Sequence, residues 1–486
     1  MKKRTLIAVD LGGESCRISL LRWDRETPEL QTIHRFSNGP MVDGRHLYWD
    51  INRIYEGVER GLRLCAEVAT EPIASIGVDG WGVDYVRIKP GGEAQQNPFC
   101  YRDERTIEAE KEVHRIIPRE TLYRLTGIQL LRFNTLYQLY ADRADGSAHH
   151  LRWLQIPEFI MYRLGGEPVS EYTNATHGAL VGLDNRNWCT EIFEKTSLDA
   201  KAPHRIVPPG SIIGSVKPTL AGLSALANTK LIVPACHDTA SAIAGIPAEG
   251  DDWAFISSGT WSLVGTLLDS PCITSEALDR NFSNLGGAGG KICFLKNVNG
   301  MWLLGQCLAQ WKLHGHEVPL NELFEACTAL PTPERLLDVD DPEFLLPGDM
   351  PAVINAHQER AGRVALSSDR EGMARMANLV LHSLAARYAQ VLQELVSITG
   401  KRIRRLYIVG GGSRNEFLNR LTAQRTGLDI MIGAAESSTI GNLAVQLATL
   451  DGDYSSVTGV SYAAVTRWAE RLLSHSGKTL SWRNSA

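Results

Sequence analysis

Short apolar runs that end at aspartate, glycine or serine recur along this chain and predict buried strands that lead into turns. Near the start, the run 5–9 predicts a strand and the run 17–23 predicts its hairpin partner. Residues 61–69 have the spacing of part of a helix, and the run 73–78 predicts a further strand that ends at Asp79. This alternation favours a mixed sheet with helices packed against it.

The later part of the chain follows a similar plan. Residues 255–265 predict a strand, a serine- and glycine-rich turn and a second strand, which echo residues 7–20 in plan although not in letters. Residues 371–398 place their apolar side chains on one broad face and predict a long amphipathic helix. The run 405–409 predicts a buried strand that leads into the glycine turn 410–415 and a leucine-rich helix. Such an echo is compatible with two related domains.

Composition narrows the class of protein. The 486 residues are 44% hydrophobic, which is enough for sizeable cores in two or three domains. The net charge of −5 comes from 50 basic and 55 acidic residues that are well mixed, so we expect neither a nucleic-acid nor a membrane-surface partner. The nine cysteines include no C-x-x-C pair, which argues against a disulfide framework or zinc site and favours a reduced, cytoplasmic setting. No apolar run reaches about 18 residues, so we expect neither export nor a membrane span.

The first candidate site is the run that starts at Asp10. Gly12 and Gly13 would let backbone amides approach an anion, and Arg17 can reach phosphate oxygens. The carboxylate of Asp10 could hold Mg²⁺, usually through water. The alternative is that the run is only a hairpin turn, since turns account for most glycine pairs.

The second candidate is the run His237-Asp238-Thr239, which follows a predicted strand at residues 231–233. A carboxylate here could accept the proton of a sugar hydroxyl as that hydroxyl attacks a γ-phosphate. The alternative is an aspartate that caps the helix beginning at the same place.

The run from Asp79 to Asp84 is denser than a turn requires, because it holds two carboxylates and a tryptophan between two glycines. Exposed backbone, a flat aromatic ring and hydroxyl acceptors suit a pocket for a polyol. The alternative is a solvated turn with Trp81 in the core. The run 133–138 and the pair Arg102-Asp103 are weaker signals, which ordinary packing and a surface ion pair would also explain.

Two common nucleotide motifs are absent. No G-x-x-x-x-G-K-[ST] occurs, because Gly290-Lys291 is followed by Ile292 and Leu472 stands at the first position of the pattern ending at Thr479. No G-x-G-x-x-G occurs either. A P-loop enzyme and a Rossmann dehydrogenase are therefore disfavoured.

Seven motifs in one order, between residue 5 and about residue 450, resemble the FGGY carbohydrate kinases, and the combination is more specific than any single motif. They are Asp10-Leu-Gly-Gly13, Asp79-Gly-Trp-Gly-Val-Asp-Tyr85, Tyr101-Arg-Asp-Glu-Arg-Thr106, Phe133-Asn-Thr-Leu-Tyr-Gln-Leu139, His237-Asp-Thr-Ala240, Ser257-Ser-Gly-Thr-Trp-Ser262 and Gly410-Gly-Gly-Ser-Arg-Asn415.

The resemblance implies an α/β, two-domain fold of the actin/hexokinase (ribonuclease H-like) type, with mixed sheets flanked by helices and a central cleft. It implies an N-terminal domain over 1–246 with the sugar site and catalytic base, a C-terminal domain over 247–450 with the nucleotide site, and a terminal helix and tail over 451–486 on the second domain.

The same resemblance implies roles for individual residues. Asp238 would be the general base, and Asp10 would hold Mg²⁺ through water. The residues expected to contact the ketose are Trp81, Gly82, His237, Asp238, Thr239 and Asn297. The residues expected to contact ATP are Gly13, Glu14, Ser15, Cys16, Arg17, Thr260, Gly305 and Gly411.

The expected reaction is transfer of the γ-phosphoryl group of ATP to a primary hydroxyl, with L-rhamnulose as the first candidate and L-fuculose or another ketose as the alternative. A non-catalytic actin-fold sensor or switch is a third hypothesis, and a monomer or small homo-oligomer is expected. Four residues depart from the family pattern: Glu14 and Cys16 replace small residues, Gly80 replaces a threonine, and Gly305, beside Gln306, stands where the family can have glutamine. These departures bear most on the identity of the sugar.

Overall fold

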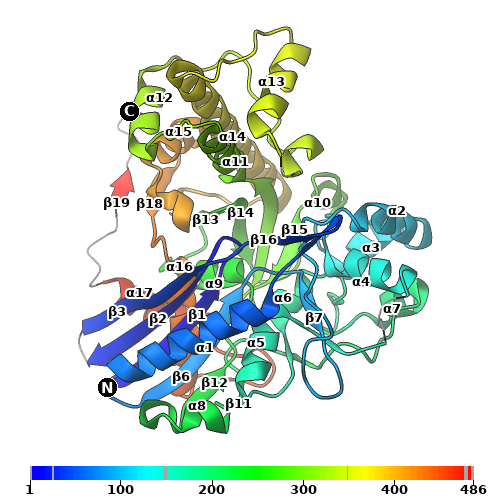
Figure 1. Cartoon of the computed structure of the whole chain (residues 1–486), viewed down its shortest axis with the longest axis vertical. Coiled ribbons are helices and arrows are strands. Elements are labelled where there is room, and N and C mark those ends of the chain that lie inside the picture. Colours follow the sequence, from blue (N-terminus) through cyan, green and yellow to red (C-terminus); the bar gives the residue numbers. More distant parts are fainter. Residues whose placement is uncertain (1–2, 25–26, 147–149, 347, 475–479, 483–486) are drawn as a thin grey trace. The chain divides into compact units, whose positions relative to one another are not determined.

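The computed structural model describes residues 3–24, 27–146, 150–346, 348–474 and 480–482 (Figure 1). The chain divides into two compact units. The first comprises residues 1–249, 267–294 and 436–477, and the second comprises 250–266, 295–435 and 478–486. Each unit is therefore assembled from segments that are far apart in the sequence.

The first unit is built on a six-stranded mixed sheet with the strand order β11-β12-β6-β1-β2-β3. Strands β1, β6 and β12 are parallel to one another, while β2 pairs antiparallel with β1 and β3, and β11 pairs antiparallel with β12. The strands are β1 (Arg4–Leu11), β2 (Ser15–Asp24), β3 (Thr27–Ser37), β6 (Ile73–Gly80), β11 (Ile212–Ser215) and β12 (Lys230–Ile232).

Strands β1 and β6 are buried along almost their whole length because helices cover the sheet. Helix α1 (Ile51–Val68) packs on β2 and β3, while α16 (Ser437–Leu450) packs on β1 and β6. The remaining helices of the unit are α2 (Thr106–Ile116), α3 (Arg119–Thr126), α4 (Thr135–Ala144), α5 (Ile156–Leu164), α6 (Tyr172–Thr176), α7 (Thr190–Thr196), α8 (Pro218–Ala221), α9 (Asp238–Ala244), α10 (Ser275–Asp279) and α17 (Tyr462–Leu473).

Short strand pairs shape the loops around this sheet. They are β4 (Met41–Asp43) with β5 (His46–Tyr48), β7 (Tyr85–Arg87) with β8 (Trp153–Gln155), and β9 (Ser170–Glu171) with β10 (Ile206–Val207).

The second unit is built on a seven-stranded sheet with the order β15-β16-β14-β13-β17-β18-β19. Strands β14 and β16 run across the unit boundaries, and β15 falls in the first unit. The strands are β13 (Trp253–Ser258), β14 (Trp261–Leu268), β15 (Ser283–Gly286), β16 (Ile292–Asn299), β17 (Arg405–Val409), β18 (Asp429–Ile432) and β19 (Leu480–Trp482).

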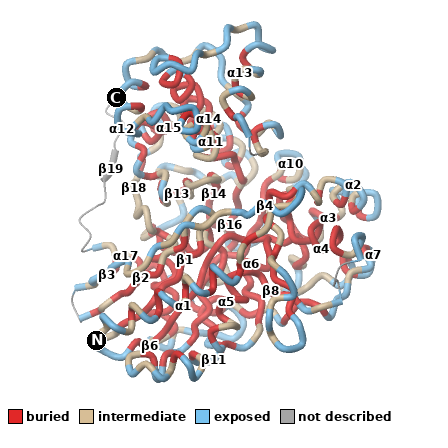
Figure 2. The backbone as a smooth tube through the Cα atoms, in the orientation of Figure 1, coloured by how far each residue is buried: buried red, intermediate tan, exposed pale blue. Residues whose placement is uncertain are grey.

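The long predicted helix is α14 (Arg370–Thr399), which begins after the N-cap Asp369 and ends at Gly400, where φ is 67°. Figure 2 shows buried residues along α14, which packs against α12 and α15. The other helices of this unit are α11 (Trp302–Leu313), α12 (Leu320–Ala329), α13 (Met350–Arg360) and α15 (Glu416–Thr426).

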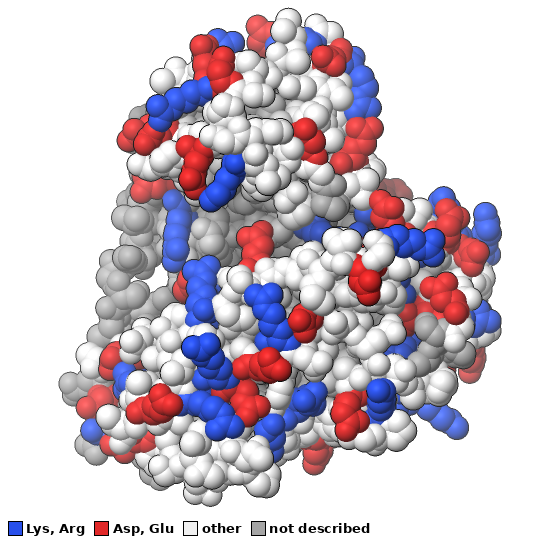
Figure 3. Space-filling model, in the orientation of Figure 1, with Lys and Arg blue, Asp and Glu red and all other residues white. Residues whose placement is uncertain are grey.

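The predicted elements are confirmed to within a few residues. Strands form over the runs 5–9, 17–23, 73–78 and 405–409, and a helix forms over 371–398. In the described part of the chain, no helix combines the length and the apolar character that crossing a membrane would require. Basic and acidic side chains are interspersed over the face shown in Figure 3, in keeping with the mixed charge pattern of the sequence.

Candidate active site

Three aspartates come together where parallel strands of the first sheet end. Asp10 and Asp79 are register partners on β1 and β6, and Gly80 forms an isolated parallel bridge with His237, the residue before Asp238. Because the carboxyl ends of neighbouring parallel strands meet at one edge of a sheet, residues 228 apart in the sequence become neighbours there. This edge is where open α/β sheets place ligands.

Asp238 has the environment of a proton acceptor. Its side chain is 36% exposed, and Thr239 donates its hydroxyl to one carboxylate oxygen at 3.2 Å. Burial by the surrounding protein and the negative charge of Asp10 raise the pKa of Asp238 to about 7. The cap alternative is not supported, because the N-cap position of α9 belongs to His237 and Asp238 is the first helical residue.

Asp10 is buried and ion-paired. Arg17 donates to its carboxylate at 2.8 Å, and Ser438 donates its hydroxyl to the same oxygen. Arg17 also pairs with Glu436, so the guanidinium is shared by two carboxylates from distant parts of the chain. Sequence motifs indicated Asp10 and Arg17 but gave no sign of Glu436 and Ser438.

Asp79 is fully buried, and Asn442 on α16 donates to one of its oxygens at 2.6 Å. The other oxygen has no hydrogen-bond partner among the described residues. Burial and the charge of Asp10 raise the pKa of Asp79 well above its usual range. A detectable signal for this contact was the spacing of Ser438, Asn442 and Gln446, which are four residues apart and so lie on one face of the helix.

The hairpin between β1 and β2 is a tight glycine turn. Gly12 donates its N–H to Ser15 at 3.2 Å, and a Cβ on Gly12 would lie 2.6 Å from that carbonyl oxygen, so glycine is required. Asn38 donates its side-chain amide to the carbonyl of Gly12. Glu14 is exposed at the tip, while Cys16 is buried on β2 and burial raises the pKa of its thiol to about 12.

Those predicted sugar-binding residues that belong to the first unit lie beside the sheet edge that carries the three aspartates. A Cβ on Gly82 would lie 3.3 Å from the His237 ring, so Gly82 and His237 are neighbours. Thr239 is buried beside Asp238. Trp81 is 6% exposed and lies in the hydrophobic core, as the turn alternative also expected, but all residues of the run 79–84 are buried, so the turn is not solvated.

Asp84 holds the loop 81–83 in place through hydrogen bonds. One of its oxygens accepts hydrogen bonds from Trp49 Nε1 at 2.6 Å, Trp81 Nε1 at 3.0 Å and the Tyr101 N–H at 3.1 Å, and the other accepts from Gln138 at 2.9 Å. Burial raises the pKa of Asp84 to about 6 although all four donors favour its charged form. Asp84 is therefore an ionised structural centre at neutral pH.

The run 133–138 holds the same loop. Val83 has a positive φ of 70°, which is strained for a β-branched residue, and Thr135 donates its hydroxyl to the Val83 carbonyl at 2.7 Å. Asn134 donates to the carbonyl of His177 at 2.9 Å. These residues therefore have a role beyond ordinary packing, because their hydrogen bonds hold the backbone on either side of the predicted sugar site at Gly82.

The pair Arg102-Asp103 is not a surface ion pair. Both residues are buried, and Asp103 accepts hydrogen bonds from the Leu47 N–H at 2.7 Å and lies 3.1 Å from His46 Nδ1. The pair therefore joins the 101–106 run to the β4–β5 hairpin.

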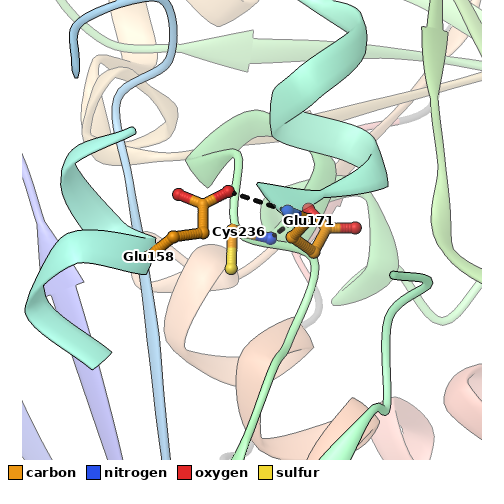
Figure 4. Close-up of side chains that lie close together, drawn as sticks. All are labelled: Glu158, Glu171 and Cys236. Carbon is orange, nitrogen blue, oxygen red and sulfur yellow. Dashed lines mark hydrogen bonds between the residues drawn. The ribbon is translucent and has the colours of Figure 1, made fainter. Parts of the chain in front are cut away.

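Two buried glutamates support the segment that carries His237 and Asp238 (Figure 4). Glu171 accepts hydrogen bonds from the Cys236 N–H at 2.9 Å, from the Thr173 N–H at 2.8 Å and from the Thr173 hydroxyl. Glu158 accepts from the Glu171 N–H at 3.1 Å, and Asn174 donates to its other oxygen. Nothing in the local sequence marked these glutamates as buried.

The glutamate pair predicts a pH dependence of stability. Burial raises the pKa of Glu158 to about 8, with a further contribution from the charge of Glu171, whose own pKa burial raises to about 7. Between about pH 5 and pH 8 the folded protein thus keeps protons that the unfolded chain has released, so stability falls as pH rises, by at most about 1.4 kcal/mol per pH unit for each proton. Glu158→Gln should flatten this slope. The measurement is the urea unfolding midpoint from pH 5 to 8, and equal slopes for both proteins would contradict the prediction.

In the second unit, Thr260 and Gly411 lie beyond the ends of the adjacent parallel strands β13 and β17, and Gly305 lies on α11. Thr260 lies in the β13–β14 turn, and its carbonyl accepts a hydrogen bond from the Trp302 N–H at the start of α11. A Cβ on Gly412 would overlap the Ser258 hydroxyl, so the glycine turn packs directly against β13. Gly305 and Gly411 have open space where a Cβ would stand.

Asn297 also belongs to the second unit, on β16, where it is 8% exposed. The structure thus gathers the predicted residues into two sets, one in each unit. Glycine backbone exposed at strand ends is suited to the close approach of a nucleotide.

Comparison with known proteins agrees with this arrangement. The N-terminal domain model of the FGGY family of carbohydrate kinases matches residues 5–245, and the C-terminal domain model of that family matches residues 254–450. A rhamnulokinase of Bacteroides thetaiotaomicron is 36% identical over 94% of this chain and 93% of its own. A rhamnulokinase of Pectobacterium carotovorum is 37% identical over 93% of this chain and 89% of its own.

Solved structures show the fold. A ligand-bound xylulose kinase from Lactobacillus acidophilus has a TM-score of 0.74 at 16% identity and covers 97% of each chain. A glycerol kinase from Plasmodium falciparum with ADP has a TM-score of 0.73 at 13% identity and covers 99% of this chain and 94% of its own. The fold is thus the two-domain actin/hexokinase-like one. With both family models matched across most of its length, the chain is an ATP-dependent sugar kinase and belongs to the FGGY family of carbohydrate kinases.

Proposed function

We propose that this kinase phosphorylates the 1-hydroxyl of L-rhamnulose with Mg-ATP, yielding L-rhamnulose 1-phosphate and ADP in L-rhamnose catabolism. The sugar is suggested by the curated relatives, which are rhamnulokinases at 35–37% identity over more than 90% of this chain. The mechanism rests on one observation, the partly exposed carboxylate of Asp238 at the edge of the sheet beside Asp10 and Asp79, and the raised pKa of about 7 agrees with it.

In the proposed reaction, Asp238 accepts the proton of the 1-hydroxyl as that oxygen attacks the γ-phosphorus of ATP. The bond between the γ-phosphorus and the β–γ bridging oxygen breaks, and ADP leaves. A general base with a pKa near the working pH is effective, because it is both available and basic enough. Phosphoryl transfer needs little covalent help, so positioning and charge stabilisation account for most of the rate.

The residues at the strand edge fit a magnesium ion. Asp10 and Asp79 offer carboxylate oxygens, which Mg²⁺ prefers, and one buried oxygen of Asp79 has no hydrogen-bond partner among the described residues. We assign Asp10 to the water shell of the ion. When bound, Mg²⁺ would neutralise charge on the β- and γ-phosphates.

We assign the sugar and the base to the N-terminal family domain, and the nucleotide to the C-terminal family domain together with the first hairpin. Trp81, Gly82, His237, Thr239 and Asn297 are the proposed sugar contacts. The proposed ATP contacts are Gly13, Glu14, Ser15, Cys16, Arg17, Thr260, Gly305 and Gly411. Arg17 must exchange a carboxylate partner for phosphate in this scheme, since Asp10 and Glu436 hold it in this structure.

The test is an ADP-release assay with Mg-ATP across L-rhamnulose, L-fuculose, L- and D-xylulose, L- and D-ribulose, glycerol and buffer alone. The highest kcat/KM is expected with L-rhamnulose. A different preferred ketose would keep the mechanism and change the substrate, and the absence of sugar-dependent ADP release would refute the proposal.

We also propose a cytoplasmic setting and a monomer or small homo-oligomer. All nine cysteines are free in the structure, which supports a reducing compartment. Sedimentation at several concentrations would establish the oligomeric state.

A further inference from the structure

Several buried polar atoms of residues near Gly82 have no hydrogen-bond partner in the part of the chain that the structure describes. His177 is 7% exposed, and neither of its ring nitrogens has a hydrogen-bond partner among the described residues. The same holds for Nδ1 of His237, which is 3% exposed, and for the side-chain oxygen of Asn174, which is fully buried. Buried polar atoms are normally hydrogen-bonded, so four such atoms in one place require an explanation.

Two of these atoms, His177 Nδ1 and the Asn174 side-chain oxygen, face Gly82, and the His237 ring lies beside them. The His177 and His237 rings have centroids 4.6 Å apart with planes inclined by 46°. A Cβ on Gly82 would lie 2.5 Å from His177 Nδ1, 3.2 Å from the Asn174 side-chain oxygen and 3.3 Å from His237 Cδ2. A side chain at position 82 would therefore collide with His177, so only glycine avoids covering His177 Nδ1 and the Asn174 oxygen.

Hydrogen bonds hold the Asn174 side chain and the backbone of His177 and His237. The Asn174 amide donates to Glu158 at 2.9 Å, which leaves the Asn174 oxygen facing Gly82. The His177 carbonyl accepts from Asn134, and the His237 N–H is 3.3 Å from the Thr173 hydroxyl that is itself held by Glu171. Groups that are held in this way bind a ligand at a lower ordering cost.

The protonation state defines the ligand chemistry. Burial lowers the pKa of His177 to about 4 and the pKa of His237 well below its usual range, so both rings are neutral at physiological pH. Each neutral imidazole has one donor and one acceptor nitrogen, and the amide oxygen adds an acceptor. A hydroxyl group both donates and accepts, whereas a phosphate or carboxylate would find no positive charge here.

We propose that His177 and Asn174 bind a hydroxyl of the ketose beside Gly82, and that His177 is a specificity-determining residue for the sugar. This inference rests on the proposed function, because it assumes that the ketose occupies the space in front of Gly82. It adds two residues to the sugar site that no sequence motif indicated. A site that hydrogen-bonds a hydroxyl discriminates strongly against a sugar that cannot satisfy it, because its buried polar groups are then left unpaired.

The test compares His177→Phe, which keeps a ring but removes both nitrogens, with His177→Gln, which keeps a donor and an acceptor. Sugar binding is measured by tryptophan fluorescence without ATP, and kcat and KM are measured for L-rhamnulose, for its C4 epimer L-fuculose and for ATP. In His177→Phe we expect about 10- to 100-fold weaker binding of the preferred ketose, a similar loss of preference between the two epimers, and an unchanged KM for ATP. His177→Gln should restore part of the binding.

The matched control is His204→Phe, since His204 is also a buried histidine, 6% exposed, whose pKa burial lowers to about 4. It should leave the sugar preference unchanged. A wild-type enzyme that phosphorylates a ketose, with His177→Phe showing equal losses on both epimers or none, would overturn this inference and leave the proposed function standing. A wild-type enzyme that binds no ketose would overturn both.

Discussion

Asp238→Asn is expected to lower kcat for the ketose by about 10³-fold while leaving the affinity for ATP nearly unchanged. The amide has the size of the carboxylate but cannot accept the hydroxyl proton. Because Asp238 is partly exposed and lies at the first turn of α9, the change should not disturb the fold. The measurement is ADP release under saturating ketose, with ATP binding followed by calorimetry.

The wild-type pH profile provides an independent check of the same assignment. Asp238 must be deprotonated to act as a base, and its raised pKa of about 7 lies inside the working range. The value of kcat/KM should therefore rise with pH up to about 7 and then level off, since the ionised fraction increases tenfold per pH unit below the pKa. A flat profile from pH 5.5 to 8 would contradict a base with this pKa.

A matched control is Asp24→Asn, which changes a 65%-exposed aspartate that pairs with Lys3 at the surface. It should leave kcat and the pH profile unchanged. Loss of ATP binding in Asp238→Asn would show that Asp238 supports the structure rather than the proton transfer.

The features predicted best from sequence are those that short segments determine alone. The strand run 5–9, the glycine turn after it and the helix over 371–398 all follow from local periodicity and turn chemistry. The positions of Asp10, Asp79 and Asp238 at strand ends followed from the same reasoning. Whether they meet depends on the pairing of β1, β6 and β12, which no local pattern determines.

The residues that sequence reasoning missed act across long separations. Asn442 reaches Asp79 across 363 residues, and Glu436 reaches Arg17 across 419. No sequence motif indicated Glu158 and Glu171, and buried glutamates are rare unless they are paired. His177 could not be assigned from sequence, since its lack of partners becomes visible only when Gly82 and His237 are placed beside it.

Asp84→Ala is expected to produce the largest loss of stability, and it should do so without touching the proposed proton transfer. The carboxylate joins four donors, Trp49, Trp81, Tyr101 and Gln138, from four separate segments. Removing it leaves these buried donors without an acceptor in apolar surroundings. We therefore expect the free energy of unfolding to fall by about 3–5 kcal/mol. The measurement is urea unfolding at pH 7.5, where the native carboxylate is ionised.

Asp84→Asn separates the charge of Asp84 from its shape. The asparagine oxygen can still accept from the Trp49, Trp81 and Tyr101 donors, and only the contact with Gln138 brings two donors together, so its cost should be smaller than that of alanine. Asp24→Ala, at the surface, should cost less than about 1 kcal/mol. If Asp84→Ala were as stable as Asp24→Ala, the carboxylate would not anchor the loop, and the strained backbone at Val83 would have to be held mainly by Thr135. Asp84→Ala could instead lose much of its free energy of unfolding and also show a raised KM for the ketose. That result would show that one buried charge both stabilises the first unit and positions Gly82 beside His237.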